Sequence, residues 1–534
     1  MLGGMQDYEL RVPRLIEHAA REHGGREIVS RWADGRETRT DWAGIARDAR
    51  KLAQALLRLG CGVGDRIATL GMNHAHHLTA WYGAIGMGGV IHTINPRLFD
   101  EQLVYIANHA EDRVLFYDAA FQPIVDRLRG QWTTIEHYIC FDPGAAAGAG
   151  GGFADLIAAE DGEYAWHEGP EREPCMLCYT SGTTGNPKGV LYEHRSTMIH
   201  AMAEVAPSVF NLSARAVILP IVPMFHAAAW GLPFAGALAG AKFVYSATND
   251  AAVLCELMNR ERVTHSAGVP TVWLALFGHI DAGGTAPQHL QQVTIGGSAA
   301  PRAMIERIMG MGVEVKHLWG MTETSPIGTA GSPPPDWEDM SHDARLDLIS
   351  KQGQVPFGIE LRVIDDDGVE QPRDGVSSGR LQVRGPWVVK RYFQADSDAI
   401  DADGWFDTGD VSVMHPDGTM QITDRSKDVI KSGGEWISSV ELENAAMGCP
   451  GVAEAAAIGI AHPKWDERPL LLVVRKPNSA VTPAEITAHL GRHVAKWWLP
   501  DEIVFVYDLP HTATGKLLKT ALRERFKDHV LASA

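Results

Sequence analysis

The sequence predicts an α/β protein built around parallel sheets, and the order of its apolar segments is the main reason. Apolar side chains recur at helical spacing at Leu52, Ala55, Leu56 and Leu59, whereas Ile67–Leu70 has the length of a short buried strand. A helix of small residues follows that strand. Strands that alternate with helices along the chain are typical of parallel sheets covered by helices.

Length and composition indicate a folded enzyme and argue against a nucleic-acid binder. At about 150 residues per domain, 534 residues predict three to four folded units. Hydrophobic residues make up 45% of the chain and charged residues 21%, which is enough to bury a core. The net charge of −18 is opposite to that of a duplex nucleic-acid binder. We therefore expect no nucleic-acid partner, whereas a nucleotide remains possible.

Cysteines and apolar runs indicate a cytoplasmic protein. The six cysteines are scattered, and Cys175-x-x-Cys178 has no second pair with which to hold zinc or build a disulfide framework. The N-terminus has no signal-peptide pattern. The longest apolar run, residues 227–241, contains Pro233 and is too short to span a bilayer. We expect no transmembrane segment.

The middle of the chain repeats the strand–loop–helix pattern, from Met176 to about Arg380. Val293–Ile295 is predicted to be a strand. Pro301 is predicted to open a helix, because proline favours the first helical position. Residues 380–425 then show the pattern of short strands separated by Asp-Gly turns.

The charged stretch 424–428 is predicted to mark a domain boundary. Beyond it, Ser438-x-x-Glu441 matches the capping box that starts a helix. A compact α+β unit of about 100 residues follows, which is an ordinary domain size. We therefore expect an N-terminal domain at residues 1–425 and a C-terminal domain at residues 426–534.

The strongest chemical signal is the loop from Tyr179 to Gly189, which reads YTSGTTGNPKG. Its glycines let backbone N–H groups turn toward a ligand, while its hydroxyls and one lysine add donors and positive charge. This combination suits a polyphosphate. The loop is not a Walker P-loop, because Pro187 stands where that motif needs glycine. The candidate phosphate-binding residues are Thr180, Ser181, Gly182, Thr183, Thr184 and Lys188.

This loop resembles the phosphate-binding signature of the adenylate-forming (ANL) superfamily, which includes acyl-CoA synthetases, firefly luciferase and peptide-synthetase adenylation domains. Four later stretches resemble the family's other motifs in the same order: Trp319–Glu323, Phe406–Asp410, Asp424–Lys427 and Thr514–Lys516. The resemblance covers about two-thirds of the chain. It implies a large N-terminal domain of α/β subdomains with a β-barrel-like subdomain, and a small mobile α+β C-terminal domain.

The resemblance assigns a nucleotide-binding role to each motif. Trp319 offers a flat face for adenine, and Thr322 offers a hydroxyl to a phosphate. Glu323, together with Thr184, implies oxygen ligands for Mg²⁺. Asp410 and Arg425 match the family's ribose contacts. The further residues matched to ATP binding are Gly297, Ser298, Ala299, Gly320 and Lys431.

The resemblance also implies two half-reactions. A carboxylate and ATP give an acyl-adenylate and pyrophosphate, and coenzyme A then displaces AMP. Lys516 matches the family lysine that bridges the substrate carboxylate and the α-phosphate, where a cation offsets the repulsion of two anions. Lys427 matches the hinge about which the C-terminal domain rotates between the steps. That rotation is expected to bring Gly433, Gly434 and Trp436 to the coenzyme A side.

The stretch around His226 indicates which acid is activated. Amino-acid-activating relatives usually place Asp after the phenylalanine, but here His226 follows Phe225 and resembles the family's gate residue near the carboxylate. The apolar run that follows resembles fatty acyl-CoA synthetases, a subgroup that includes medium-chain enzymes and methylmercaptopropionate-CoA ligases. We expect medium- to long-chain fatty acids, with a short thioether acid or an aryl acid as alternatives. The expected acyl pocket comprises Trp230, Gly231, Gly296 and Met321.

Three other functions compete with this one. A luciferase-like oxygenase shares the adenylation chemistry, but the C-terminus lacks the Ser-Lys-Leu address. A peptide-synthetase domain needs an attached carrier module, for which the sequence leaves no room. A non-catalytic nucleotide sensor is disfavoured by Lys516 and Glu323. By resemblance to the long-chain enzymes, we also expect a homodimer.

Overall fold

The computed structural model describes residues 3–143, 152–180, 186–425, 427–432, 435–511, 517–531 and 533. Its internal contacts divide the chain into two compact units. The first unit comprises Met1–Thr294, Gly320–Gly328 and Gly385–Asp401, and the second comprises Ile295–Trp319, Thr329–Arg384 and Ala402–Ala534. The boundary expected after residue 425 falls within the second unit and stays a prediction.

A six-stranded sheet in the first unit carries the Thr-Gly-rich loop. Its order is β6-β5-β3-β4-β7-β8, with parallel pairing except for the antiparallel pair β7–β8. The strands are β3 (Arg66–Leu70), β4 (Val90–Thr93), β5 (Asp112–Tyr117), β6 (His137–Cys140), β7 (Pro174–Tyr179) and β8 (Gly189–Glu193). Leu103, Leu115 and Trp132 belong to a core cluster that packs beside this sheet.

Five strands of a second sheet also belong to the first unit, in the order β11-β9-β10-β1-β2. All pair in parallel except the antiparallel pair β1–β2. They are β1 (Glu27–Arg31), β2 (Glu37–Asp41), β9 (Val217–Pro220), β10 (Lys242–Ser246) and β11 (His265–Gly268). Along the chain, β12 (Gln292–Ile295), β13 (Glu314–Gly320) and β14 (Ile327–Ala330) follow.

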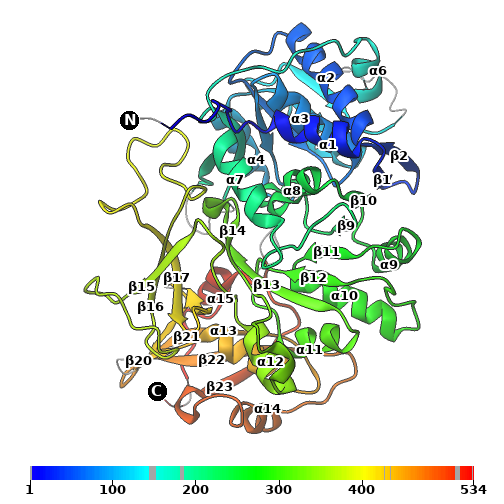
Figure 1. The fold of residues 1–534 in the computed structure, drawn as a ribbon. Coiled ribbons are helices and arrows are strands. Elements are labelled where there is room, and N and C mark those ends of the chain that lie inside the picture. Colours follow the sequence, from blue (N-terminus) through cyan, green and yellow to red (C-terminus); the bar gives the residue numbers. More distant parts are fainter. Residues whose placement is uncertain are drawn as a thin grey trace. The chain divides into compact units, whose positions relative to one another are not determined.

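In the described part of the first unit, ten helices alternate with these strands, as the sequence predicts. Helices α1, α2 and α3 pack against one another (Figure 1). The Asp41 side chain starts α2 by accepting from the Gly44 amide. The helices are α1 (Pro13–His23), α2 (Trp42–Arg58), α3 (Ala75–Gly86), α4 (Asp100–Ala110), α5 (Gln122–Leu128), α6 (Phe153–Ala158), α7 (His194–Glu204), α8 (Leu232–Ala239), α9 (Ala251–Arg260) and α10 (Pro270–Asp281).

The second unit contains two mainly antiparallel sheets. One has the order β15-β16-β17-β18, with β15 (Glu360–Ile364), β16 (Gly379–Arg384), β17 (Phe406–Met414) and β18 (Met420–Arg425). The other has the order β20-β19-β22-β21, and β23 pairs in parallel with β22. Its strands are β19 (Ile430–Ser432), β20 (Glu435–Ile437), β21 (Val452–His462), β22 (Asp466–Arg475) and β23 (Glu502–Phe505). The helices are α11 (Arg302–Gly310), α12 (His342–Ser350), α13 (Ser439–Met447), α14 (Pro483–Leu490) and α15 (Lys519–Arg525).

The local predictions agree with these elements. Ile67–Leu70 lies in β3, Val293–Ile295 lies in β12, and α11 starts directly after Pro301. Ser438 caps α13 by accepting from the Glu441 amide. No helix among the described residues is both long and apolar enough to cross a bilayer. The six cysteines are buried and unbridged.

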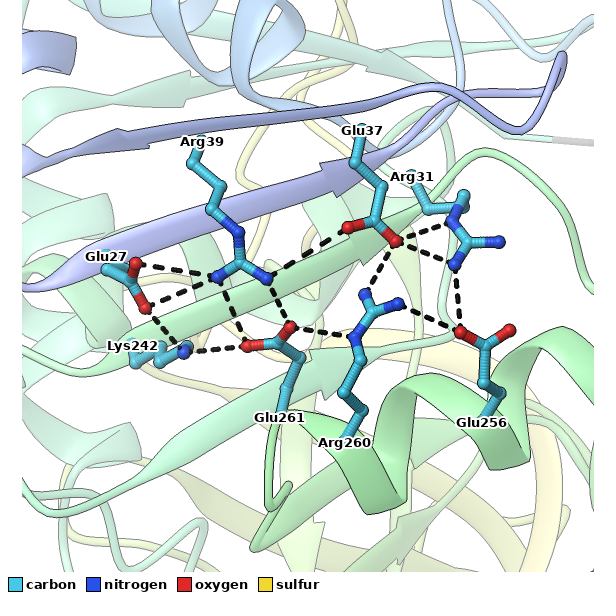
Figure 2. A network of polar contacts seen from close by, with 8 residues as sticks. All are labelled: Glu27, Arg31, Glu37, Arg39, Lys242, Glu256, Arg260 and Glu261. Carbon is cyan, nitrogen blue, oxygen red and sulfur yellow. Dashed lines mark hydrogen bonds and ion pairs between the residues drawn. The ribbon is translucent and has the colours of Figure 1, made fainter.

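Eight charged side chains, four acidic and four basic, form a network that joins β1, β2, β10 and the C-terminal end of α9 (Figure 2). Glu261 lies at the centre, with contacts of 2.5 Å to Arg39, 2.9 Å to Lys242 and 3.1 Å to Arg260. Burial opposes ionisation of Glu261, but hydrogen bonds and charges from these three cations outweigh it and lower its pKa to about 2. The network therefore holds the sheet edge to α9 through a carboxylate that stays ionised.

We expect Glu261→Gln to lower the free energy of unfolding at pH 7 by about 1–3 kcal/mol, because three cations lose their shared acceptor. Because folding lowers the pKa of Glu261, its contribution is complete above the unfolded value of 4.5 and is lost as the pH falls toward about 2. Thermal unfolding of both proteins between pH 7 and pH 3 measures this. Equal midpoints at pH 7 would contradict it.

Glu256→Gln is the matched control, because the Glu256 side chain is 51% exposed. Exposed ion pairs contribute about 0–1 kcal/mol, so this variant is expected to unfold close to the parent protein at every pH.

Candidate active site

The base of the Thr-Gly-rich loop is closed by two backbone-directed hydrogen bonds. The Thr180 amide donates to the Lys188 carbonyl at 2.9 Å, and the Lys188 amide donates to the Thr180 hydroxyl at 3.2 Å. The register of β7 and β8 pairs Tyr179 with Gly189 at the same place. The prediction that a strand precedes this segment and another strand follows it is therefore confirmed. The predicted phosphate-binding residues Ser181, Gly182, Thr183 and Thr184 lie outside the described residues.

Tyr392 connects the base of this loop to Glu323. The Lys188 ammonium lies 4.8 Å from the centroid of the Tyr392 ring, and the Tyr392 hydroxyl donates to Glu323 Oε1 at 2.8 Å. Burial and the charge of Glu323 raise the pKa of Tyr392 above its usual value, so the phenol stays a neutral donor. Two successive contacts thus connect Lys188 to Tyr392 and Tyr392 to Glu323 within the first unit.

Thr322 and Glu323 lie on the short 3-10 helix η3 (Thr322–Thr324). Its carbonyl groups are held from two directions: the Tyr192 hydroxyl donates to the Thr322 carbonyl at 2.7 Å, and the Val389 amide donates to the Glu323 carbonyl at 2.7 Å. Strand β8 and the segment after residue 385 therefore fix the backbone of Thr322 and Glu323, which are predicted to bind phosphate and metal.

Gly320 and Met321 form the approach to this short helix. A Cβ at Gly320 would lie 1.9 Å from the Pro326 carbonyl oxygen, so only glycine fits there. The Met321 amide donates to the Pro326 carbonyl at 3.0 Å and to the Thr324 hydroxyl at 3.0 Å. The chain is thereby turned tightly just before Thr322.

The surroundings of Glu323 fit a magnesium ion that arrives with nucleotide phosphates. Mg²⁺ prefers oxygen ligands and takes few protein carboxylates when phosphates are present. Glu323 is 7% exposed and offers carboxylate oxygens. Within the described part of the chain, no three His, Cys, Asp or Glu side chains gather as a metal site of their own. A metal bound here would therefore need ligands from the nucleotide.

The segment predicted to line the acyl pocket has a strained backbone. His226 precedes the 3-10 helix η2 (Ala227–Gly231), and Trp230 is 5% exposed. Left-handed backbone costs non-glycine residues about 1–2 kcal/mol each. The φ angles are 37° at Ala227, 52° at Ala229, 54° at Trp230 and 73° at Gly231.

A narrow cavity of about 10 Å³ brings His226 beside the start of the Thr-Gly-rich loop. His226 and Phe225 line one part of it, and Tyr179 lines another. The hydroxyl of Tyr179 also lies 2.6 Å from Nδ1 of His109. The remaining lining residues are Thr93, Asn95, Leu98 and Ile106.

In the second unit, the indole of Trp319 contacts the predicted ribose ligand directly. Trp319 Nε1 donates to Asp410 Oδ2 at 2.8 Å, and Arg425 Nε lies 3.5 Å from Asp410 Oδ1. Both Trp319 and Asp410 are 7% exposed. One carboxylate is thus oriented by an indole N–H on one oxygen and a guanidinium on the other.

The Thr408-Gly409 pair interrupts β17 without ending it. Asp407 pairs with Gln382 and Val411 pairs with Arg380, so the residues between them bulge away from β16. Gly409 has a φ of 72°, and the Asp410 amide donates to the Thr408 hydroxyl at 3.1 Å. Such bulges re-aim side chains, and this one presents Asp410 to Trp319.

The remaining predicted residues of the second unit lie on a turn and a strand. Gly296, Gly297, Ser298 and Ala299 follow β12, with Gly297 at a φ of 81°. Lys431 lies exposed on β19, and its amide donates to Glu467 at 3.0 Å. The register of β19 and β20 pairs Lys431 with Trp436. Gly433, Gly434 and Lys516 lie outside the described residues, as does the Trp436 side chain.

The predicted hinge residue Lys427 follows β18 at a turn. The amides of Asp428 and Val429 donate to the Arg425 carbonyl at 2.8 and 2.9 Å. Asp428 also pairs with Arg523 of α15 at 2.7 Å. The turn at this position therefore has a defined local geometry within the second unit.

Sequence reasoning missed Tyr392 and Tyr192, which hold Glu323 and Thr322. Neither tyrosine lies in a recognisable motif, and each is far in sequence from its partner. The run of aromatic residues around Tyr392 was the one available signal, but it does not indicate a hydroxyl contact. The indole-to-carboxylate bond of Trp319 and Asp410 was likewise not predicted.

The comparisons with known proteins agree with the motifs. The AMP-binding enzyme family matches residues 16–393, and the AMP-binding enzyme C-terminal domain family matches residues 441–516. A medium-chain-fatty-acid–CoA ligase of Ectopseudomonas oleovorans is 47% identical, covering 100% of this chain and 99% of that protein. A 3-methylmercaptopropionyl-CoA ligase of Ruegeria lacuscaerulensis is 48% identical, covering 99% of each. A long-chain-fatty-acid–CoA ligase of Thermus thermophilus is 45% identical, covering 98% of this chain and 97% of that protein.

Solved structures share the fold. An anthranilate CoA ligase in complex with anthranoyl-AMP has a TM-score of 0.87 at 24% identity, covering 99% of each chain. A benzoate CoA ligase from Burkholderia xenovorans has a TM-score of 0.83 at 23% identity, covering 97% of this chain and 100% of that one. The predicted ANL fold, with its large α/β N-terminal part and small C-terminal domain, is confirmed. The chain belongs to the AMP-binding enzyme family, the adenylate-forming superfamily that its motifs resemble.

Proposed function

We propose that this protein is an AMP-forming acyl-CoA synthetase, an acid–thiol ligase that joins a carboxylic acid to coenzyme A through an acyl-adenylate. The observation that carries this proposal is the full-length similarity to CoA ligases, at 45–48% identity over 98–100% of the chain. The contacts that connect Lys188, Tyr392 and Glu323 at the base of the Thr-Gly-rich loop support it.

The chemistry needs no general base, because a carboxylate is already ionised at pH 7. Its oxygen attacks the α-phosphorus of ATP, the bond to the β-phosphate oxygen breaks, and pyrophosphate leaves. The thiol of coenzyme A then attacks the acyl carbon and AMP leaves. A thiol that attacked the free carboxylate would have to expel one of its oxygens, which is a poor leaving group. In the acyl-adenylate the leaving group is AMP, which is a good one, so the nucleotide makes thioester formation possible.

The proposed roles of the side chains follow from their contacts and charges. Lys188 and Thr322 bind phosphate oxygens, and Glu323 holds Mg²⁺, which would neutralise phosphate charge. Asp410 accepts the ribose hydroxyl protons, with Trp319 and Arg425 holding its carboxylate in position. Lys516 is the proposed catalytic residue, and Lys427 is the proposed hinge.

The acid is proposed to be a medium- to long-chain fatty acid, with a short thioether acid such as 3-methylmercaptopropionate as the alternative. The three relatives named above carry these different acyl specificities at nearly equal identity, so identity supports the reaction class more strongly than the acid. His226, Trp230, Gly231, Gly296 and Met321 are proposed to contact the acyl group. A cytoplasmic homodimer is also part of the proposal.

A pyrophosphate-release screen over carboxylic acids, with and without coenzyme A, tests the function. The expected result is release with at least one class of acid, accompanied by an acyl-adenylate and by AMP when coenzyme A is present. ATP binding without pyrophosphate release from any acid would favour the nucleotide-sensor alternative. Light emission with luciferin and oxygen would favour the oxygenase.

We expect Lys516→Ala to lower the rate of acyl-adenylate formation by about 100-fold or more, because one transition-state cation is lost. Thioester formation from chemically supplied acyl-adenylate should change far less. Pyrophosphate release measures the first step and thioester yield the second. Adenylation at the parent rate would remove Lys516 from catalysis.

Trp319→Phe is expected to raise the KM for ATP by about tenfold, because it keeps an aromatic face but removes a charge-assisted N–H donor to Asp410. The KM for the acid should stay close to the parent value. Initial rates with each substrate varied in turn measure both constants. A larger effect on the acid than on ATP would argue against the nucleotide role.

Trp230→Ala is expected to change the order of preference among acids of different length while leaving the KM for ATP within about twofold. Trp230 is buried within the strained η2 segment, and removal of its side chain is expected to open space for the acyl group. The kcat/KM values for a series of acids measure the effect. A loss confined to ATP binding would place Trp230 outside the acyl pocket.

A further inference from the structure

Glu204, the last residue of α7, carries a buried carboxyl group that no motif explains. The residue is 1% exposed, and among the described residues neither carboxyl oxygen meets the hydrogen-bond criteria, although His200 Nδ1 lies 3.5 Å from Oε1. Burial raises the pKa of Glu204, and the neighbouring His200 partly offsets the effect. Buried carboxyl groups are normally paired, because leaving one unpaired costs free energy. We therefore looked for a function that would explain a buried carboxyl group at this position.

The carboxyl group fills the space that a side chain at Gly231 would occupy. A Cβ built on Gly231 would lie 2.3 Å from both Glu204 carboxyl oxygens. Gly231 also has a φ of 73°, which disfavours any other residue. Gly231 and Glu204 are therefore complementary in size, because the missing side chain at Gly231 leaves room for the carboxyl group of Glu204.

His200 holds the other side of this carboxyl group. Its Nε2 accepts from the Ile327 amide at 3.2 Å, so in the neutral ring the proton lies on Nδ1, which is 3.5 Å from Glu204 Oε1. The ring packs edge-on against Trp387 at 5.6 Å, and the Trp387 indole donates to the Ile327 carbonyl at 2.9 Å. Glu204 thus lies next to a buried cluster of His200, Trp387 and Ile327, and this packing restricts the movement of its side chain.

We propose that Glu204 is a specificity-determining residue that ends the acyl pocket behind Gly231 and, within the proposed range of fatty acids, makes the enzyme prefer medium-chain acids to longer ones. This inference rests on the proposed function, in which Trp230 and Gly231 contact the acyl group. A buried carboxyl group whose nearest polar contact is the 3.5 Å contact with His200 is a poor neighbour for methylene groups. Its volume also closes the space into which a longer chain would extend.

Glu204→Ala should extend the range of acids, because it empties the space beside Gly231. Each additional methylene group that becomes buried is worth about fourfold in affinity. Two such groups predict that the ratio of kcat/KM for dodecanoate to kcat/KM for hexanoate rises by at least about tenfold. Glu204→Gln keeps the size and polarity of the side chain, so its ratio should stay within about twofold of the parent ratio.

A double variant tests the pairing with Gly231. Gly231→Ala alone is expected to lose activity, because the new methyl group meets the carboxyl group. Combining it with Glu204→Ala removes that clash and refills part of the space, so activity should recover and the chain-length ratio should fall back toward the parent value. Additive effects of the two changes would contradict the proposed contact.

The measurements are initial rates with hexanoate, octanoate, dodecanoate and hexadecanoate, together with the KM for ATP. Met202→Ala on the same helix is the control, because that side chain is 45% exposed. If Glu204→Ala does not fold, Glu204→Val leaves a smaller void, and a shift in the same direction is expected. An unchanged chain-length ratio in a folded, active shortened variant overturns the inference.

The two proposals fail in distinguishable ways. If the parent protein releases pyrophosphate with none of the acids, the proposed function fails and this inference falls with it. If the parent protein is active and the shortened variants keep its chain-length profile, only the role of Glu204 is disproved.

Discussion

The antiparallel pairing of β7 with β8 is the constraint on which the proposed nucleotide site depends. The two strands lie at one end of an otherwise parallel sheet, and their register returns the chain to its starting point at Thr180 and Lys188. The Phe393 amide donates to the Gly189 carbonyl at 2.8 Å at the same place. Lys188 is thereby held next to the segment that carries Tyr392, and through it next to Glu323.

Two buried glutamates of the first unit illustrate how environment separates roles. Glu323 accepts a hydrogen bond from Tyr392 and is proposed to bind a metal ion carried by the phosphates, a role that needs its negative charge. In the described part of the chain, neither carboxyl oxygen of Glu204 has a hydrogen bond, and this carboxyl group lies against Gly231 and 3.5 Å from the His200 imidazole. The first suits an ionic ligand, whereas the second suits the closed end of a pocket. The same side-chain type thus serves opposite purposes.

The sequence signals for the class of reaction and those for the acid come from different parts of the chain. The motifs that predict adenylation are short runs of contiguous residues, and they are matched to the phosphates, ribose and adenine of ATP, which is the same molecule whichever acid is activated. The acyl group varies among the relatives named above. In the proposed pocket, this choice depends on the packing of η2 against α7, where one residue changes the available volume. We propose residue 204 as one such position.

The class of fold, the family and the positions of the predicted strands and helices follow from the sequence alone, because they depend on local periodicity and on motifs of contiguous residues. β3, the capped start of α13 and the strands on either side of the Thr-Gly-rich loop were all predictable in this way. The folded structure is needed to see which hydroxyl contacts Glu323, which indole contacts Asp410, and which side chain lies behind Gly231. Those contacts join residues 69, 91 and 27 positions apart, with no periodic signal between them. Their geometry exists only when strands and helices pack, because no local interaction brings such residues together.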